Sequence, residues 1–548
     1  MKIWDHYRPT DYLALAPWVW MQFESAEAPG PFPFLGGLAP EVAVALHEAH
    51  QHLLSAVETV ISDVFAQRAP VDDPRRRRMV EDAYAELVQS RPQLRQHIRC
   101  GRDAQGQFHW EFARDAARSA TVTSAGARLF NAVKRQAIPF QLERGASHAV
   151  AKLLGMLDGT LHVGAIRTVV AASREQERVL TQVLEAMQHY ECLVASPTST
   201  VRQRWFDVVG DRDLVHLGHA ALLYRQRDQC LLFDPWLLPW FAEMPMPSLW
   251  GMVLPRPSAV FLTHDHDDHV EPRSLLSLPK EIPIVVPSRR NRKHYHYDYH
   301  ALLRDLGFTQ VVELAHGERW AFDGGAVVSV PFYGEDPCDL EMPRNCYLIA
   351  DRGQNTLIHA DSGPTNGGRS ALTDGVIQRL VEQHGRIGTV WASQQQLKEV
   401  RTYAAHAALA HPGTWLDVGE NGFLTNAYLA ELCRVAGATQ FVSYATGGAD
   451  WYPDHLSFTF SARNPARTAL LTAQWEPPRE LATALAPFGC RYHAAHALDR
   501  IRVEADGVVS IASCARELDP MALYRLDHGL PAFMTTQAAQ PRPSAQPR

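Results

Sequence analysis

The sequence predicts an α/β sandwich, in which two sheets carry outer helices, preceded by a mainly helical N-terminal domain. Short apolar runs bounded by turns dominate the chain beyond about residue 200, as expected of strands. Before that point, apolar residues recur at helical spacing. A dense cluster of histidine and aspartate follows one of the apolar runs, where a strand is expected to end. The cluster therefore marks the end of that strand as the place for a polar site.

Length and composition describe a soluble globular protein. The 548 residues are 46% hydrophobic and 21% charged, which suits about two or three domains with ample core. A net charge of −7 over this length gives no reason to expect nucleic-acid binding. The chain shows neither an apolar start typical of a signal peptide nor an apolar run of membrane-spanning length. Eight scattered cysteines without a Cys-x-x-Cys pair indicate reduced thiols, so we expect a cytoplasmic protein whose metal ligands are not thiolates.

Residues 1–200 are predicted to form a helix-rich N-terminal domain. Helical spacing of apolar side chains is clear in 41–67 and 150–157. The chain then continues as a Gly-containing turn, a helix, an amphipathic helix over 175–189 and a short strand near 191–194. This order is typical of a winged-helix-like module. Because the domain lacks a basic face, we expect it to mediate homodimerisation or the docking of a partner such as a carrier protein.

A second domain is expected after a Pro-, Ser- and Thr-containing linker at 196–200. It is predicted to span 205–515, and the C-terminal segment 516–548 should end in a disordered tail. Strands are expected at 214–224, 230–234, 259–262, 284–286, 310–314, 326–332, 346–350, 356–359, 388–391 and 439–444. Helices at 374–384 and 424–435 complete the predicted sandwich.

The cluster from Thr263 to His269 contains three imidazoles and three carboxylates within seven residues. His264 and His266 alternate along the chain, so an extended segment places both on one face. Asp268 and His269 follow after the chain turns, and reach the same cavity from another side. Such a cluster indicates metal binding, and so many ligands in one segment favour two metals over one.

The motif His264-x-His266-x-Asp268-His269 after a strand resembles the signature of the metallo-β-lactamase superfamily. Two upstream segments are similar to the first strands of its lactonase and phospholipase-D-like branch, Leu217–Leu223 and Leu232–Trp236. Downstream, His359–Gly363 resembles the segment that carries the carboxylate bridging two metals. The resemblance implies an αββα sandwich with a dinuclear site bridged by Asp361, and leaves the reaction open.

One departure from the family pattern lies after the strand at 326–332. Hydrolases of the superfamily have a ligand His there, whereas this chain continues with Tyr333, Gly334, Glu335 and Asp336. Glu335 is the expected ligand, with Asp336 as the alternative. A carboxylate in place of an imidazole makes the site harder, which favours iron or manganese over zinc. The same substitution marks the diiron β-hydroxylase of the chloramphenicol pathway, a nonribosomal-peptide tailoring oxygenase that also has a helix-rich N-terminal domain.

The resemblance implies one iron held by His264, His266 and Glu335, a second held by Asp268, His269 and His455, and Asp361 between them. Glu335 and Asp361 are then the expected catalytic ligands. The last ligand is open, because the strand at 439–444 ends in Tyr444 where the family has a His. His455 is preferred as the commoner ligand type, and Tyr444, His406 and His411 are alternatives. Asp234 is expected either to orient a ligand His or to be a turn carboxylate.

The resemblance implies a non-haem diiron oxygenase. It would use two iron ions and O2 to hydroxylate an amino-acid-derived substrate, either a free small molecule or one held on a carrier protein, in natural-product biosynthesis. The sequence has no flavin or iron–sulfur motif, so a separate reductase would supply electrons. The alternative is a zinc- or manganese-dependent hydrolase of a phosphodiester, lactone or amide. Glu335 separates these two interpretations, since a carboxylate at this position favours iron.

Overall fold

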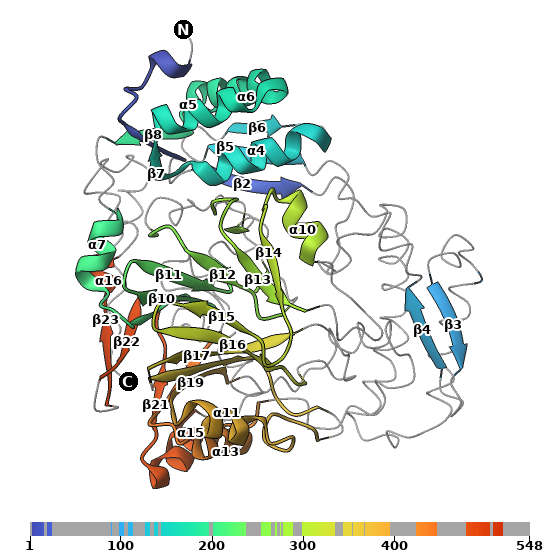
Figure 1. The fold of residues 1–548 in the computed structure, drawn as a ribbon, viewed down its shortest axis with the longest axis vertical. Helices are drawn as coiled ribbons and strands as arrows, with labels where there is room; N and C mark the ends of the chain where they lie inside the picture. Colours follow the sequence, from blue (N-terminus) through green and yellow to red (C-terminus); the bar gives the residue numbers. More distant parts are fainter. Residues whose placement is uncertain are drawn as a thin grey trace, which may run out of the picture.

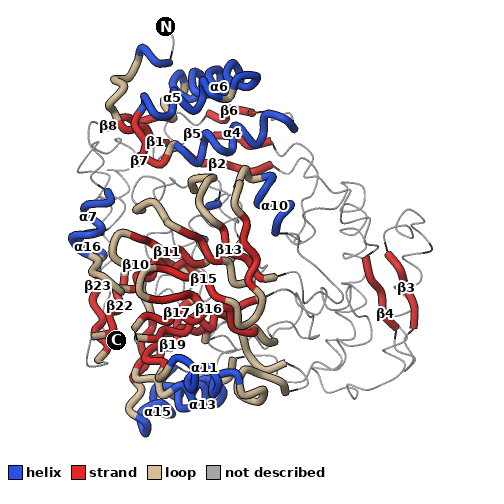
Figure 2. Tube along the Cα trace, viewed as in Figure 1, coloured by secondary structure: helices blue, strands red, loops and turns tan. Residues whose placement is uncertain are grey.

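A computed structural model gives the fold of the chain. It describes residues 3–15, 19–24, 89, 98–102, 108–112, 126–131, 136–140, 144–196, 201–236, 254–264, 269–270, 274–275, 278–288, 299–334, 344–352, 354–365, 368–394, 424–445, 478–504 and 508–518. These ranges contain two large sheets packed face to face, with helices outside both (Figure 1). Figure 2 shows by colour that helices lie on the outer sides of the central strands.

The first sheet has eight strands in the order β14-β13-β12-β11-β10-β9-β22-β23. Their bounds are β9 Leu214–Gly218, β10 Ala221–Gln226, β11 Gln229–Phe233, β12 Ala259–Phe261, β13 Ile284–Pro287, β14 Val311–Leu314, β22 Asp499–Val503 and β23 Val509–Ser513. Strands β11 to β14 run parallel to one another, with Phe233 of β11 opposite Phe261 of β12. Their carboxyl ends therefore meet at one edge of the sheet.

The second sheet has seven strands in the order β15-β16-β17-β18-β19-β20-β21. Their bounds are β15 Arg319–Phe322, β16 Gly325–Pro331, β17 Asn345–Asp351, β18 Asn355–Ala360, β19 Ile387–Ser393, β20 Gln440–Tyr444 and β21 Arg491–Ala494. β16 and β18 are each antiparallel to β17, and β18, β19 and β20 are parallel. The ends of β16, β18 and β20 consequently lie at the same edge.

Side-chain alternation divides the core of the sandwich into layers. Phe261 of β12 faces the second sheet, where its ring meets that of Tyr347 edge-on. Within the first sheet it stacks on Phe233 of β11, with ring centroids 4.9 Å apart. Its neighbour Val260 belongs to the core on the opposite face of the first sheet. The outer face of the second sheet is covered by α11 (Val376–His384), α13 (Asn426–Ala436) and α15 (Pro478–Leu485) (Figure 1).

The N-terminal module packs on the outer face of the first sheet. Its described helices are α4 (Arg144–Met156), α5 (Val163–Ala172) and α6 (Glu177–His189), beside a three-stranded sheet of β7 (Asp158–His162), β1 (Tyr12–Leu15) and β8 (Leu193–Ser196). Buried residues of these helices, such as Leu153 and Leu184, share one continuous core with Val260 and with Leu303 of α10 (Tyr299–Asp305). The module therefore serves as an outer layer of the sandwich.

The structure confirms the predicted α/β sandwich. Helices and strands occupy the expected ranges from 150 to 196 and from 259 to 444, with ends shifted by a few residues where they are described. The expected strand at 214–224 is two strands, because the chain turns at Gly218 and His219, both at positive φ (115° and 45°). The expected helix at 41–67 lies outside the described residues.

Several elements were not predicted. In the N-terminal module these are the short strands β1, β2 (Val19–Glu24), β3 (Ile98–Arg102), β4 (Phe108–Phe112), β5 (Gly126–Asn131), β6 (Gln136–Phe140) and β7, which lies where a Gly-containing turn was predicted. Near the C-terminus they include β22 and β23, which extend the first sheet. Among the described residues, no helix combines the length and the apolarity needed to cross a bilayer. The six cysteines with described side chains are all free thiols.

Candidate metal centre

The ends of three strands bring histidine and aspartate together at one edge of the sandwich. Thr263 and His264 follow β12, and Asp361 follows β18 of the other sheet. Ligand atoms of His264, His269 and Asp361 all lie within 4.8 Å of one another. The two imidazoles are buried and the Asp361 side chain is 11% exposed. The chain therefore forms a compact group of nitrogen and carboxylate donors with little access to water.

Asp234, directly after β11, sets the orientation of this group. Its Oδ2 accepts hydrogen bonds from His269 Nδ1 at 2.8 Å and from the Thr263 hydroxyl at 2.6 Å. Its Oδ1 accepts the Thr263 backbone N–H at 2.8 Å. The Thr263 hydroxyl uses its only proton toward Asp234, so at 2.9 Å it accepts from His264 Nδ1. This network assigns the proton of both imidazoles to Nδ1.

In both histidines the Nε2 that faces Asp361 is consequently the unprotonated ring nitrogen. Nε2 of His269 lies 2.9 Å from Asp361 Oδ2, and Nε2 of His264 lies 3.9 Å from the same oxygen. Lone pairs of two imidazole nitrogens and one carboxylate oxygen thus face each other in a buried place. Without a cation between them, these lone pairs repel one another. The donor set fits a divalent metal ion bound by two imidazoles and a carboxylate. Asp234 plays the part of the hydrogen-bond partner that fixes a ligand His.

Hydrogen bonds between the sheets hold this corner in register. The Tyr347 hydroxyl of β17 donates to the Leu262 carbonyl at 2.7 Å, and the Asn345 amide donates to the Thr263 carbonyl at 2.8 Å. Burial raises the pKa of Tyr347 well above its usual range, so the phenol stays a donor. The segment entering the histidine cluster is therefore tied to the second sheet as well as to Asp234.

The turn after β16 lies against the Asp361 loop. The Tyr333 amide donates to the Ser362 hydroxyl at 2.9 Å, and the Gly363 amide donates to the Tyr333 carbonyl at 2.9 Å. Gly334 has a φ of +62°, and a Cβ built on it would lie 2.5 Å from the Pro364 carbonyl and 2.6 Å from the Gly363 carbonyl. Only glycine fits this close backbone approach. The residue that follows, 335, is therefore attached to a turn fixed beside Asp361.

Seven of the residues expected in or near the site lie outside the described ranges. They are His266, Asp268, Glu335, Asp336, His406, His411 and His455. Their places as ligands remain predictions from the sequence. The structure brings together His264, His269 and Asp361 from the expected set.

Tyr444, the alternative for the last ligand, is fully buried at the end of β20. Its ring contacts Trp391 edge-on at 5.6 Å in the core between the sheets. Burial raises the pKa of Tyr444 well above its usual range, and the nearby carboxylates of Asp234 and Asp361 add to this effect. The backbone amide of Ala360 lowers this pKa to a smaller extent. No described residue forms a hydrogen bond of good geometry with the Tyr444 hydroxyl. Tyr444 thus lies beneath the metal corner as a neutral phenol.

Sequence reasoning missed three residues of this corner. The Thr263 hydroxyl connects Asp234 to both imidazoles, and its place directly before His264 was the available signal. The His219 ring lies 5.7 Å from that of His269 and 4.3 Å from that of Trp236. His219 and Trp236 therefore form a wall of the site. His219 lies between β9 and β10 and Trp236 follows β11, and their spacing along the chain does not reveal that they are in contact.

Comparison with known proteins gives partial sequence matches and structural matches that cover most of the chain. No protein-family model matches the sequence. The 4-amino-L-phenylalanyl-(CmlP-peptidyl-carrier-protein) 3-hydroxylase of Streptomyces venezuelae is 28% identical over 190 residues, 34% of this chain and 34% of that protein. The mouse cytidine monophosphate-N-acetylneuraminic acid hydroxylase is 25% identical over 169 residues, 29% of this chain and 28% of that enzyme. The matched part thus spans about a third of the length of these curated relatives.

The structural match extends over nearly the whole chain. The crystal structure of CmlA, a diiron β-hydroxylase from Streptomyces venezuelae, is similar with a TM-score of 0.55 and 16% identity. The match covers 89% of this chain and 99% of that one. At this identity the match establishes a shared fold. The sandwich and its N-terminal module thus have a fold similar to that of this crystal structure.

Proposed function

We propose that this protein is an O2-dependent non-haem diiron hydroxylase acting on an amino-acid-derived substrate. The observation that carries the proposal is the described turn at Tyr333–Gly334 after β16, which in the sequence directly precedes Glu335, at the place where hydrolases have a His. That turn is hydrogen-bonded to the Asp361 loop through Tyr333 and Ser362 at 2.9 Å. A carboxylate entering the donor set from this side makes the site harder, which suits iron.

The described residues have separate parts in the proposed site. His264 and His269 offer Nε2 to metal because Thr263 and Asp234 hold their Nδ1 protons. Asp361 offers a carboxylate from the opposite sheet, where it reaches both imidazoles. Trp236 and Phe332 lie against His219 and His264, and this apolar contact limits water at the corner. Two irons bound together would supply the electron sharing that O2 activation requires.

The substrate class and partners of the proposed hydroxylase rest on the relatives. One matched relative is named for hydroxylating an aminoacyl group on a peptidyl-carrier protein. A tethered aminoacyl substrate is accordingly the first to test, and the N-terminal module is the proposed place for carrier docking or homodimerisation. A separate reductase is the proposed electron donor, because the sequence carries no flavin or iron–sulfur motif.

The experiment is metal analysis combined with two assays on the same protein. Protein reconstituted with iron, zinc or manganese is given a panel of free and carrier-bound amino acids with a reductant and O2, and the products are weighed by mass spectrometry. We expect O2-dependent addition of one oxygen atom with iron alone. Uptake of only zinc or manganese, together with hydrolysis of a phosphodiester, lactone or amide, would establish the hydrolase alternative instead.

A further inference from the structure

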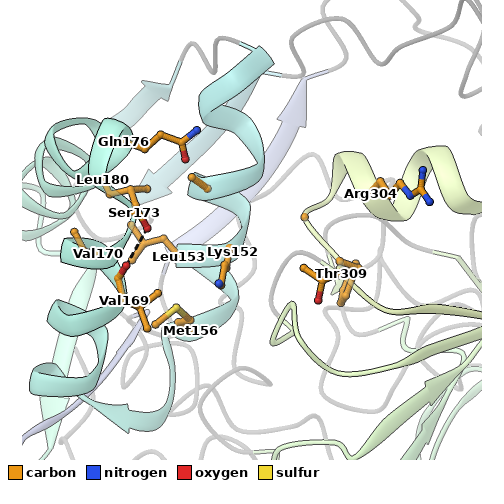
Figure 3. Close-up of a pocket in the computed structure, with 13 residues that line it drawn as sticks. Lys152, Leu153, Met156, Val169, Val170, Ser173, Gln176, Leu180, Arg304 and Thr309 are labelled. Carbon is orange, nitrogen blue, oxygen red and sulfur yellow. Dashed lines mark hydrogen bonds between the residues drawn. The ribbon is translucent and has the colours of Figure 1, made fainter.

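A cavity lies between the N-terminal module and the first sheet, and its described lining includes none of the metal-centre residues. Its volume is about 570 Å³. One wall is formed by α4, α5 and α6, and the other by the end of α10 and the segment that follows it (Figure 3). This volume lies in the range of small-molecule sites, which often form between two structural units.

The floor of the cavity is apolar. It is made by the side chains of Leu153, Met156, Val170, Leu180 and Phe308, each at most 3% exposed. Ser173, Gln176 and Thr309 add a few polar groups above this floor, and the Ser173 hydroxyl is already engaged with the Val169 carbonyl at 2.9 Å. An apolar body fits such a floor, with polar contacts left for one end of a ligand.

Among the described residues that line the cavity, the charged ones are both cations. Lys152 comes from α4 and Arg304 from α10 across the gap, and both are exposed (Figure 3). Neither side chain has an ion pair or hydrogen bond within the described part of the chain. The described residues that line the cavity include no aspartate or glutamate, although the whole protein carries a net charge of −7. Two unpaired cations on opposite walls are complementary to an anion.

The two walls are joined rigidly beneath the cavity. A Cβ on Gly155 of α4 would lie 2.3 Å from the Leu278 carbonyl, so helix and loop are in direct backbone contact. The buried Lys280 amine donates to the Leu275 carbonyl at 2.6 Å and lies 4.2 Å from the centre of the Phe308 ring. The Lys280 carbonyl in turn accepts the Thr309 amide at 3.0 Å. The spacing between the walls is therefore fixed by the fold.

We infer that this cavity binds a small amphipathic anion, a molecule with an apolar body and one carboxylate or similar head group. The apolar body lies on the floor between α4, α6 and Phe308. The anionic head lies at the mouth, between Lys152 and Arg304. Because the two walls belong to different units, the ligand stabilises the joint between the N-terminal module and the sandwich. The inference does not depend on the reaction at the metal centre.

Calorimetric titration of the full-length, metal-loaded protein tests this inference. Octanoate is the probe, with octanol and octylamine as the matched neutral and cationic compounds. We expect octanoate to bind more tightly than either, and the double variant Lys152→Ala/Arg304→Ala to weaken octanoate by about threefold to tenfold. Thr309→Trp, at an exposed position of the lining, should block binding sterically. Arg167→Ala removes an exposed cation of α5 that does not line the cavity, and should leave binding unchanged.

Three results would overturn the inference. Equal binding of octanoate and octanol, unaffected by the double variant, would contradict an anion site. Absence of octanoate binding would contradict a ligand site altogether. Binding that survives both cavity variants and disappears on metal removal would belong to the metal centre.

Discussion

The two sides of the metal centre are held by different kinds of contact. The histidine side, made of Asp234, Thr263, His264 and His269, depends on side-chain hydrogen bonds to one buried carboxylate. The carboxylate side, made of the Tyr333–Gly334 turn and the Ser362–Pro364 segment beside Asp361, depends on close backbone packing. The histidine side should therefore respond to changes of charge and donor count, and the carboxylate side to changes of size.

The largest effect is expected from Asp234→Asn. An amide accepts on one atom only, so its NH2 group would face donors that the carboxylate now satisfies. Both imidazoles would lose their fixed tautomer, and metal affinity should fall about 10- to 100-fold. The measurement is competition for metal with a chelator.

Asp351→Asn is the control, because Asp351 is also buried and accepts the Tyr224 hydroxyl at 2.6 Å, far along β17. It should lose stability and keep metal affinity, and equal loss of affinity in both variants would contradict this account.

Gly334→Ala tests the carboxylate side by size alone. The added methyl group meets two carbonyl oxygens at 2.5–2.6 Å at a φ of +62°, which should cost about 1–3 kcal/mol. We expect metal content to fall by moving the following residue away from Asp361. Gly368→Ala is the matched control, since Gly368 has a φ of +77° and nothing within 4 Å of its built Cβ. If both variants lose metal equally, backbone strain is responsible and the close approach is not.

Thr263→Val removes one hydroxyl from the histidine side and keeps its shape. His264 Nδ1 would lose its acceptor, while the residue 263 amide still reaches Asp234. A single lost hydrogen bond of this kind costs about 0.5–1.5 kcal/mol, so metal affinity should fall less than in Asp234→Asn. Thr263→Ser should restore it. Unchanged affinity in Thr263→Val would show that the hydroxyl does not orient His264.

The smallest effect is expected from Asp374→Asn. Asp374 accepts the Tyr333 hydroxyl at 3.0 Å and pairs with the exposed Arg369 at 2.7 Å. The Arg369 guanidinium, with help from Tyr333, holds the pKa of the Asp374 carboxyl below its usual range. The ionised Asp374 carboxylate therefore stabilises the folded protein fully above the unfolded-state pKa of about 3.9. This contribution is lost as the pH falls through the lower folded-state pKa. The difference in Tm between the native protein and the variant should be small and constant from about pH 5 to 8, and shrink toward pH 3. A difference that varied between pH 5 and 8 would contradict the assignment.

Local sequence signals predicted the sandwich well. Apolar runs such as 326–332 and 346–350 lie close to β16 and β17, because strands buried on both faces need continuous apolar residues. The N-terminal strands β1 to β6 escaped prediction, since they are short and lack a clear alternation of apolar and polar residues. The turn at Gly218–His219 was missed because it depends on positive φ at a non-glycine residue.

The site was predictable where ligands are close in sequence and not where the fold joins distant segments. His264 and His269 lie in one cluster after an apolar strand, and the resemblance of His359–Gly363 to the family's bridging segment placed Asp361 with them. The role of Thr263, and the walls formed by His219 and Trp236, follow from contacts between strands far apart in the chain. Gly334 was visible in the sequence, but its purpose appears only from the carbonyl groups that face it.

Iron content per chain in Glu335→Ala, measured beside Asp336→Ala, tests the central claim most directly. If Glu335 is the carboxylate that makes this an iron site, Glu335→Ala should lose iron and O2-dependent turnover. Asp336→Ala should keep both if residues 335 and 336 are extended, because neighbouring side chains then point to opposite faces. Glu335→His should bind metal again with a preference for zinc, since imidazole suits zinc. Loss of iron in Asp336→Ala with none in Glu335→Ala would identify the other carboxylate as the ligand. Full iron content and turnover in both variants would contradict the diiron account and favour a hydrolase.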